Sequence, residues 1–226
     1  GRNVYFGTGS DCPHLLDSFT AERRDFLLKD VEDAVRIADA LPNIDFTMSM
    51  GLATDIEKEV QYQHKYAKML RLSTKPQVIT AADRECLNDL IDMAAVVLGD
   101  RKEVARKPIF VLYDEPTSPL VNTHEAIEKL LFMADSRLPT NYAPGIMAGA
   151  TSPVTLAGAI AQAAAENLAG LVIHQLRNPG APFIFGGGMS PMDMSSMQPT
   201  YSAPEAMMTQ AGLCQIGRCL YNLPTW

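Results

Sequence analysis

The sequence predicts an α/β protein built on a parallel β-sheet, and it favours a (β/α)8 TIM barrel that is incomplete, with about seven strands. Strand-like and helix-like segments alternate along the chain at spacings of roughly 30 residues, which is typical of βαβ units. The run Pro108–Tyr113 is almost continuously apolar, as in a strand buried on both faces. An open doubly wound sheet is the alternative, because a barrel typically needs ~250 residues and this chain has 226.

The predicted strands are short runs of apolar and β-branched residues, bounded by residues that favour turns. No internal repeat and no low-complexity linker separates them, so we expect one domain over residues 1–226. In chain order the predicted strands are Val4–Gly9, Ile44–Met50, Gln77–Thr80, Pro108–Tyr113, Asn141–Met147, Pro182–Phe185 and a last strand from Leu223.

The predicted helices repeat apolar residues at helical spacing, as at Val31 and Val35, and Gly99 provides a stop signal. Ser152 is the predicted N-cap of the longest helix, with Pro153 at its first position. The predicted helices are Val31–Leu41, Glu57–Leu72, Asp83–Leu98, His124–Leu138, Thr155–Leu176 and Ala203–Tyr221.

Composition and charge exclude some classes of partner. The chain is 47% hydrophobic and 20% charged, with a net charge of -7. Neither a basic stripe nor a run of Lys and Arg is present, which argues against nucleic acid and anionic membranes as partners. The long uncharged stretch before Glu166 is interrupted by Pro153 and Gly158, so we expect a buried element rather than a membrane span.

Cysteine and histidine give little sign of a disulfide or a metal. The four cysteines form no CxxC pair, so we expect reduced, buried thiols. His64, His124 and His174 lie on predicted helices without an HxxxH partner, and we expect no metal.

Functional residues of a parallel α/β fold gather after the carboxyl ends of its strands. Acids at these ends can hold a cation, and the faces of aromatic rings can do the same. The alternatives are acids that cap the following helix and aromatic residues of the core. The candidate substrate-binding residues are Asp11, Tyr113, Asp114, Glu115, Tyr142, Met147 and Phe185.

A second group of candidates follows the strand Pro182–Phe185. Glycine lets a backbone approach a ligand closely, and methionine suits a soft, adaptable surface. The alternatives are tight turn geometry for the glycines and gap-filling for the methionines. The sequence GGGMS is neither GxGxxG nor a Walker motif, so it gives little support to nucleotide binding. The candidate cofactor-contacting residues are Gly186, Gly187, Gly188, Met189 and Met192.

Lysines are absent from the predicted strand ends. Lys75 and Lys107 precede strands and belong to the opposite edge of the sheet. We therefore expect no Schiff-base lysine of the aldolase type in this chain.

Four stretches carry a resemblance to a known family: FGTG, PIFVLYDEPTSPL, SPVTLAGAIAQAAAENLAGLVIHQLRNPGAP and the late APE…NLPTW. Together they resemble the trimethylamine methyltransferase (MttB) superfamily from Gly1 to Trp226, and this chain looks like an internal piece of such a protein. The resemblance implies a cytoplasmic TIM-barrel enzyme that takes a methyl group from a methylated amine and hands it to Co(I) of a separate corrinoid protein.

The resemblance also implies which branch and which partners to expect. Trimethylamine enzymes carry pyrrolysine shortly after the strand that begins here at Leu223, whereas most relatives lack it, so we expect a pyrrolysine-free glycine betaine or other quaternary-amine methyltransferase. Its final catalytic residues would lie beyond Trp226. The chain departs from the trimethylamine enzymes in placing Tyr-Asp-Glu before Pro-Thr-Ser-Pro. We expect a cobalamin-type corrinoid carried by the partner protein, no permanently bound cofactor, and a homo-oligomer.

Two other functions stay open. One is a TIM-barrel lyase or aldolase, which needs a lysine or a metal site at the strand ends. The other is a non-catalytic protein that binds a quaternary amine in the same place. Methyl transfer to cob(I)alamin is expected only of the methyltransferase.

Overall fold

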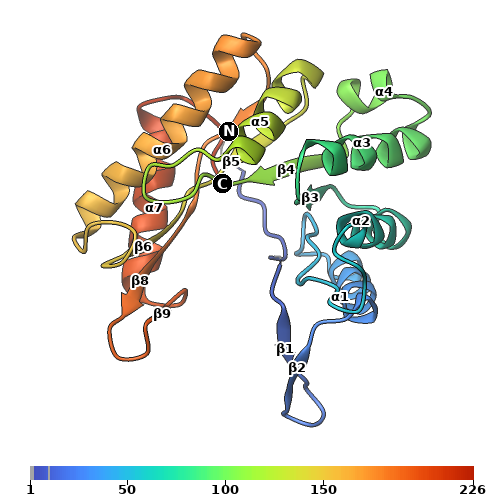
Figure 1. Ribbon diagram of the computed structural model, residues 1–226, viewed down its shortest axis with the longest axis horizontal. Helices are drawn as coiled ribbons and strands as arrows, with labels where there is room; N and C mark the ends of the chain where they lie inside the picture. The colour runs from blue at the N-terminus through green and yellow to red at the C-terminus, as the bar shows by residue number, and fades with distance from the viewer. Residues whose placement is uncertain (1–2, 10) are drawn as a thin grey trace. The chain divides into compact units, whose positions relative to one another are not determined.

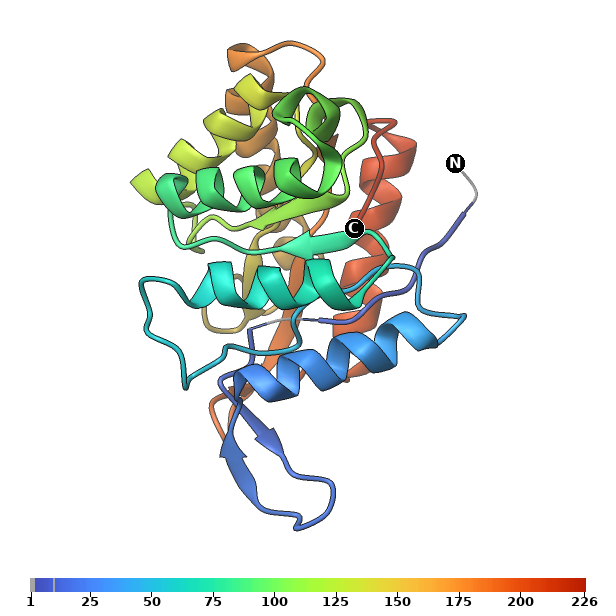
Figure 2. The ribbon, with the colours of Figure 1, turned by 90° about the vertical axis from the view of Figure 1, so that its right-hand side faces the viewer.

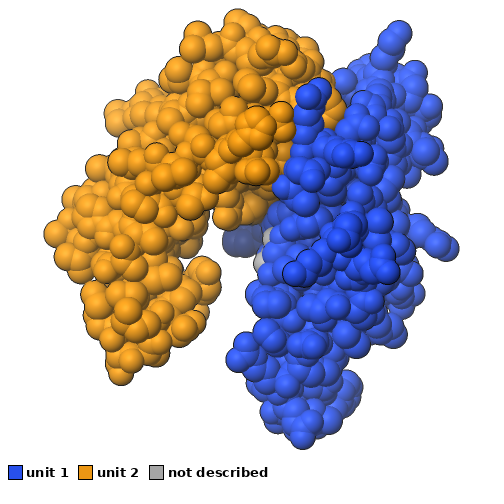
Figure 3. Space-filling view, in the orientation of Figure 1, with its two compact units in different colours: residues 1–112 blue, residues 113–226 orange. Residues whose placement is uncertain are grey.

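The computed structural model describes residues 3–9 and 11–226. Contacts divide the chain into two compact units, Gly1–Leu112 (unit 1) and Tyr113–Trp226 (unit 2), which Figure 3 shows in different colours. Each unit is described by itself.

Parallel pairing organises the strands of unit 1. Strand β3 (Gln77–Ile79) pairs in parallel with β4 (Phe110–Asp114), in the register Gln77↔Phe110 to Ile79↔Leu112. The predicted strands Val4–Gly9 and Ile44–Met50 are extended but form only isolated parallel bridges, so their prediction as full strands is wrong. A short antiparallel hairpin of β1 (His14–Leu16) and β2 (Arg23–Asp25) was not predicted.

The helices of unit 1 are α1 (Leu28–Ala40), α2 (Gln61–Leu72), α3 (Arg84–Leu98) and α4 (Arg101–Arg106), with α1, α2 and α3 packed side by side (Figures 1 and 2). Helix α1 buries Val31 and Val35, as the spacing predicts. Helix α3 starts where the Asp83 carboxylate accepts a hydrogen bond from the Cys86 N–H at 2.8 Å. It ends at Gly99, whose φ of +108° suits glycine.

Unit 2 contains two further parallel pairs. Strand β5 (Thr140–Tyr142) pairs with β7 (Phe183–Ile184), and β6 (Gly145–Ala148) pairs with β8 (Gly188–Asp193). Strand β9 (Gln198–Pro199) then returns antiparallel to β8. The predicted strand Asn141–Met147 is therefore two strands, separated at Pro144, which has no N–H to donate to a strand ladder.

The helices of unit 2 are α5 (His124–Ser136), α6 (Leu156–Arg177) and α7 (Pro204–Cys219), and α6 packs against both of the others. Small residues let α6 approach the strands closely. A Cβ added at Gly170 would lie 2.1 Å from the Tyr142 ring, so only glycine fits there. The sheet-facing core of this region contains Ile146, Ala148, Ala159, Ala163, Phe185, Met189 and Leu213.

The N-cap of α6 differs from the prediction. The Thr155 hydroxyl accepts a hydrogen bond from the Gly158 N–H at 3.3 Å, whereas the Ser152 hydroxyl contacts only the Pro153 carbonyl oxygen, at 3.5 Å. Thr155 is thus the N-cap, three residues after the predicted one.

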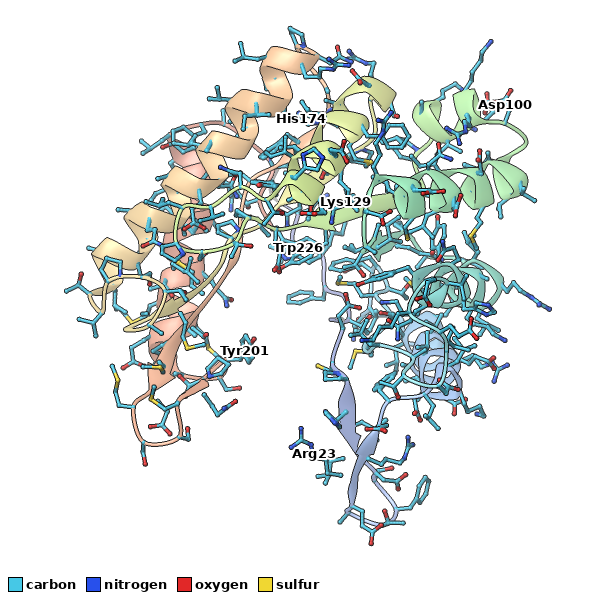
Figure 4. All side chains as sticks on the ribbon, in the orientation of Figure 1. Arg23, Asp100, Lys129, His174, Tyr201 and Trp226 are labelled. Carbon is cyan, nitrogen blue, oxygen red and sulfur yellow. The ribbon has the colours of Figure 1, made fainter. Side chains whose placement is uncertain are left out.

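Helix α6 is the one helix, among the residues that the structure describes, whose length and apolar composition would suffice to cross a membrane. Its buried positions include Glu166, Asn167 and His174, which contact the rest of unit 2. Burial lowers the pKa of His174 (labelled in Figure 4) to about 4, so the imidazole is neutral at pH 7. The core helix of a globular unit passes the same test of length and composition.

The α/β class with parallel strands is confirmed by the parallel pairs β3–β4, β5–β7 and β6–β8. Residues 3–9 and 11–226 do not close into a barrel, and the barrel stays a prediction.

The cap assignment predicts the effect of two matched substitutions. Thr155→Ala should lower the free energy of unfolding of the chain by about 1 kcal/mol, because an orphan N–H of the first turn loses its acceptor. Ser152→Ala should change it by less than about 0.5 kcal/mol. Urea unfolding followed by circular dichroism measures both, and a larger loss for Ser152→Ala would restore Ser152 as the cap.

Candidate functional site

Strand alternation divides the predicted site residues of unit 2 between two faces. Along β4, Leu112 and Asp114 are buried, whereas Tyr113 between them is half-buried and Glu115 after them is exposed. Successive side chains of a strand point to opposite faces. The same alternation on β6 and β8 buries Ile146 and Met189 against the helices. We call the other face the open face; its residues are Tyr113, Glu115, Gly145, Met147, Gly188 and Met192.

Asp114 faces α5 rather than the open face. Its Oδ1 lies 2.9 Å from the Lys129 ammonium and also accepts a hydrogen bond from the Glu115 N–H at 3.0 Å. Both side chains of the ion pair are almost fully buried, and Lys129 projects from α5 (Figure 4). Burial raises the pKa of the Asp114 carboxyl to about 6, although Lys129 acts to lower it. This pair therefore joins a strand to a helix.

Three other predicted ligand residues lie in the core. Tyr142 is 0% exposed, and its hydroxyl donates a hydrogen bond to Asn122 at 2.8 Å. Phe185 is also 0% exposed, with its ring 5.3 Å from that of Tyr221. Met189 is buried beside Ile146. The structure gives these side chains packing roles, and it gives no support to their contact with a ligand.

Two aromatic rings and a carboxylate lie at the open face: Tyr113 and Glu115 belong to it, and Trp226 contacts Tyr113. The ring centroids of Tyr113 and Trp226 are 6.0 Å apart, at an interplanar angle of 54°. Glu115 carries its carboxylate to within 3.7 Å of the position that a Cβ on Gly145 would occupy. Trp226 is not among the predicted site residues; its contact with Tyr113 joins distant parts of the sequence, which local patterns do not reveal.

The three consecutive glycines have different reasons to be glycine. Gly186 has a φ of +149°, and a Cβ there would lie 2.6 Å from the Trp226 carbonyl oxygen. A Cβ at Gly187 would lie 2.7 Å from the Pro144 carbonyl oxygen. Gly188 has neither restriction, because its added Cβ would meet no atom within 4 Å. Close packing thus explains Gly186 and Gly187 but leaves Gly188 without a structural reason.

Gly188 on β8 pairs in register with another glycine, Gly145 on β6. A Cβ at Gly145 would make only ordinary van der Waals contacts. The next register pair is Met147 with Ser190, and Ser190 is buried. The two paired glycines leave a strip of backbone without side chains, exposed at Gly145, where Glu115 is near, and half-buried at Gly188.

The methionines after the glycines divide into two kinds. Met189 is core and Met192 is half-buried on β8, whereas Met194 and Met197 are 59% and 62% exposed in the β8–β9 hairpin. The hairpin follows from the return of β9 along β8, which the sequence analysis did not predict.

Two buried side chains of α6 form hydrogen bonds with strand ends and with the loop after β4. The Asn167 amide donates hydrogen bonds to the carbonyl oxygens of Tyr142 at 3.0 Å and Gly186 at 2.6 Å. The Glu166 carboxylate accepts hydrogen bonds from the Ser118 hydroxyl at 2.7 Å and the Leu120 N–H at 3.0 Å. Sequence reasoning missed both residues; their signal was polar side chains within an otherwise apolar helix.

Asp11, the remaining predicted site residue, belongs to unit 1. Its carboxylate lies 2.6 Å from the ammonium of Lys65, which reaches it from α2. The expectation that no lysine reaches the strand ends is therefore wrong, since Lys65 does so from a helix. The available signal was a lysine on the buried stripe formed by Gln61, Lys65 and Met69.

Possible metal ligands do not cluster in the described residues, and the cysteines differ in part from the prediction. Among residues 3–9 and 11–226, no group of three or more His, Cys, Asp or Glu side chains could hold a metal ion. The thiols of Cys86 and Cys214 are buried and half-buried, but Cys12 and Cys219 are exposed, so the expected burial is wrong for those two.

Comparison with known proteins gives a consistent match. The sequence profile described as trimethylamine methyltransferase (MTTB) matches residues 1–226. A trimethylamine methyltransferase of Desulfitobacterium hafniense (strain DSM 10664 / DCB-2) is 30% identical over 226 residues, which is 100% of this chain and 45% of that protein. A glycine betaine methyltransferase of Desulfitobacterium hafniense (strain Y51) is 27% identical, over 100% of this chain and 47% of that protein.

A third relative, a proline betaine:corrinoid methyltransferase of Eubacterium limosum, is 27% identical over 92% of this chain and 44% of that protein. The chain thus spans about half the length of the curated relatives it matches.

The Asp114–Lys129 ion pair predicts that substitutions of its two residues have non-additive effects on the free energy of unfolding. Asp114→Leu or Lys129→Met alone should lower the free energy of unfolding by about 3–5 kcal/mol, because each leaves the opposite buried charge without its counter-ion. The double variant should recover most of this loss, because an apolar pair of similar size replaces both charges. Chemical unfolding of the four chains tests the cycle, and additive losses would show that the two side chains do not act as a pair.

Proposed function

The chain belongs to the trimethylamine methyltransferase family, and on that premise we propose that the full-length protein takes a methyl group from a methylated amine and passes it to a corrinoid held by a partner protein. The substrate that we propose is a quaternary amine such as glycine betaine. The observation that carries this proposal is the open face of unit 2, where Tyr113, Trp226 and Glu115 offer two rings and a carboxylate.

These side chains suit a quaternary ammonium. Such a cation has no N–H to donate, so hydrogen bonding to its nitrogen cannot hold it. Ring faces attract it through their quadrupoles, and a carboxylate attracts it by charge. Glu115 would supply the charge, and Tyr113 and Trp226 would supply the ring surface. The thioether of Met147, half-buried on the same face, would contact the methyl groups.

The methyl acceptor brings its own reactivity: a corrinoid in the Co(I) state is itself the nucleophile. The chain therefore needs to bind, orient and desolvate the amine, and it needs no serine, cysteine or lysine nucleophile. The strip of backbone at Gly145 and Gly188 fits the approach of a broad ligand, because neither glycine carries a side chain and a Cβ at Gly188 would find open space.

The lyase or aldolase alternative gains little from Lys65. A Schiff base needs a free amine, whereas the Lys65 side chain forms an ion pair with the Asp11 carboxylate at 2.6 Å. A non-catalytic binding protein stays the second candidate, because the same open face would serve it.

A direct assay separates these functions. The full-length protein is mixed with cob(I)alamin and with its corrinoid protein, and trimethylamine, glycine betaine, carnitine and proline betaine are offered separately. We expect an absorbance change to the methylated corrinoid with a quaternary amine. Binding of an amine by calorimetry without any methyl transfer would support the binding protein instead.

The neighbouring glycines Gly187 and Gly188 give a matched test of where the corrinoid approaches. Gly188→Ala should fold as the unchanged protein does but slow methyl transfer about tenfold or more, as expected when a misplaced atom disturbs the reacting geometry. Gly187→Ala should instead lower the free energy of unfolding, because its Cβ meets the Pro144 carbonyl oxygen. Turnover and unfolding are measured for both variants. Unchanged turnover in Gly188→Ala would contradict the proposal that the backbone at Gly145 and Gly188 admits the corrinoid.

A further inference from the structure

The β8–β9 hairpin projects from unit 2 and carries exposed apolar side chains (Figure 1). Met194 and Met197 lie in the turn between its two strands, and both are exposed. Tyr201, labelled in Figure 4, follows β9 and is exposed too, as is Val154 just before α6. We call these four residues the hairpin surface. Single exposed apolar side chains are ordinary, whereas a group of them marks an interaction site.

Packing holds the hairpin against the rest of unit 2. A Cβ on Gly149 would lie 2.8 Å from Met194 Cε and 3.8 Å from Val154 Cγ2, so both side chains pack around this glycine. The Thr200 N–H and hydroxyl both donate to the Pro191 carbonyl oxygen, at 3.0 Å and 2.8 Å, and hold the chain after β9 beside β8. The hairpin surface is therefore a fixed part of the unit.

The turn of the hairpin is built around Asp193. Its carboxylate accepts hydrogen bonds from the Ser195 N–H at 3.0 Å and the Ser196 hydroxyl at 2.7 Å. Its carbonyl oxygen accepts a hydrogen bond from the Met197 N–H at 2.8 Å. Met197 has a φ of 57°, a conformation that glycine or asparagine adopts at lower cost. An exposed methionine at this position does not help the turn to form, which indicates another role.

The segments that build the hairpin surface carry acids and no cation. Residues 138–154 and 178–217 contain no Lys, Arg or His, and their acids are Asp193 and Glu205, both exposed. A second copy of this chain, with its net charge of -7, would bring the same acids to the interface, and like charges across an interface are costly. The surface instead complements a partner with an apolar face and a basic rim.

Strand β8 connects this surface to the backbone where we propose that the corrinoid approaches. It begins at Gly188 and ends at Asp193, so Met194 lies about 20 Å from Gly188 along the strand. A standard interface covers about 800 Å² on each partner and is thus roughly 30 Å across, which spans both points. The acceptor must also leave after each transfer, and flexible methionines suit a surface that binds and releases a partner.

We propose that the hairpin surface is the docking site of the corrinoid-carrying protein, which meets it with an apolar patch that has Lys or Arg at its rim. This inference rests on the proposed function, and it gives the partner a defined place on this chain. The surface would hold the partner while the backbone at Gly145 and Gly188 admits its corrinoid. Free cob(I)alamin has no protein to dock, so its reaction should not depend on the hairpin.

Met197→Asn in the full-length protein tests this docking site. Asparagine suits the φ of 57° and removes the thioether, so the variant should fold as well as the unchanged protein. Calorimetry with the corrinoid protein should give a Kd about tenfold higher or more, as for the loss of an anchor residue of an interface. Methyl transfer to free cob(I)alamin should be unchanged. An unchanged Kd would overturn the inference.

Leu176→Gln is the matched control, because it also replaces an exposed apolar side chain by an amide. Leu176 is 80% exposed, against 62% for Met197, but it lies in the last turn of α6. That turn is about 30 Å along the helix from Val154. The control should leave the Kd unchanged, and equal effects of the two variants would count against a specific surface.

A charge pair of variants tests the basic rim. Glu205→Gln should raise the Kd about threefold at low salt and less at high salt, because screening weakens the attraction of exposed charges. Glu125→Gln removes the same charge from the first turn of another helix, α5, and should have no effect. Equal effects of both variants would contradict a basic rim that faces the hairpin.

Other occupants of the hairpin surface would give different results. If another part of the same chain covered it, Met197→Asn would lower the free energy of unfolding; if a second copy covered it, the variant would sediment as a smaller species. Either result with an unchanged Kd would overturn the inference. A protein that binds the corrinoid protein through the hairpin, but transfers no methyl group even to free cob(I)alamin, would disprove the proposed reaction and leave the docking site standing.

Discussion

Two buried side chains of one helix hold the strand ends on which the candidate site of unit 2 depends. Asn167 donates to the last residue of β5 and to Gly186 after β7, and Glu166 accepts from the loop that follows β4. A buried carboxylate without hydrogen bonds would be strongly unfavourable, so the loop and the helix stabilise each other. The loop that α6 holds in this way, through Ser118 and Leu120, is the one that begins with Glu115.

The alternation of side chains along β4 then decides which of them lie on the open face and which pack against a helix. Asp114 and Glu115 are adjacent acids of one type, yet one is buried against Lys129 and the other is exposed on the open face. The same rule separates Tyr113 from its buried neighbours. The two adjacent acids thus have different surroundings: Asp114 joins β4 to α5 through Lys129, whereas Glu115 lies on the open face, where we propose that a cation binds.

The sequence predicts regular, local features well. Most of the helices lie within a few residues of their predicted bounds, because apolar spacing and capping residues are local signals. The split at Pro144 and the β8–β9 hairpin depend on pairing between distant segments, which local patterns do not reveal. The contacts of the candidate residues were also beyond prediction from local sequence patterns. Lys65 lies 54 positions from its partner Asp11, and Gly188 can be distinguished from Gly187 only when the surrounding atoms are known.

The most direct measurement of this account is a crystal structure of the full-length protein with glycine betaine bound. The account predicts that the ligand contacts side chains of the open face, above all Tyr113 and Glu115, and that Asp114 keeps its contact with Lys129. A ligand held by Asp114, Tyr142 or Phe185, with the helices displaced to admit it, would contradict the division of the strand residues into a packing face and a binding face.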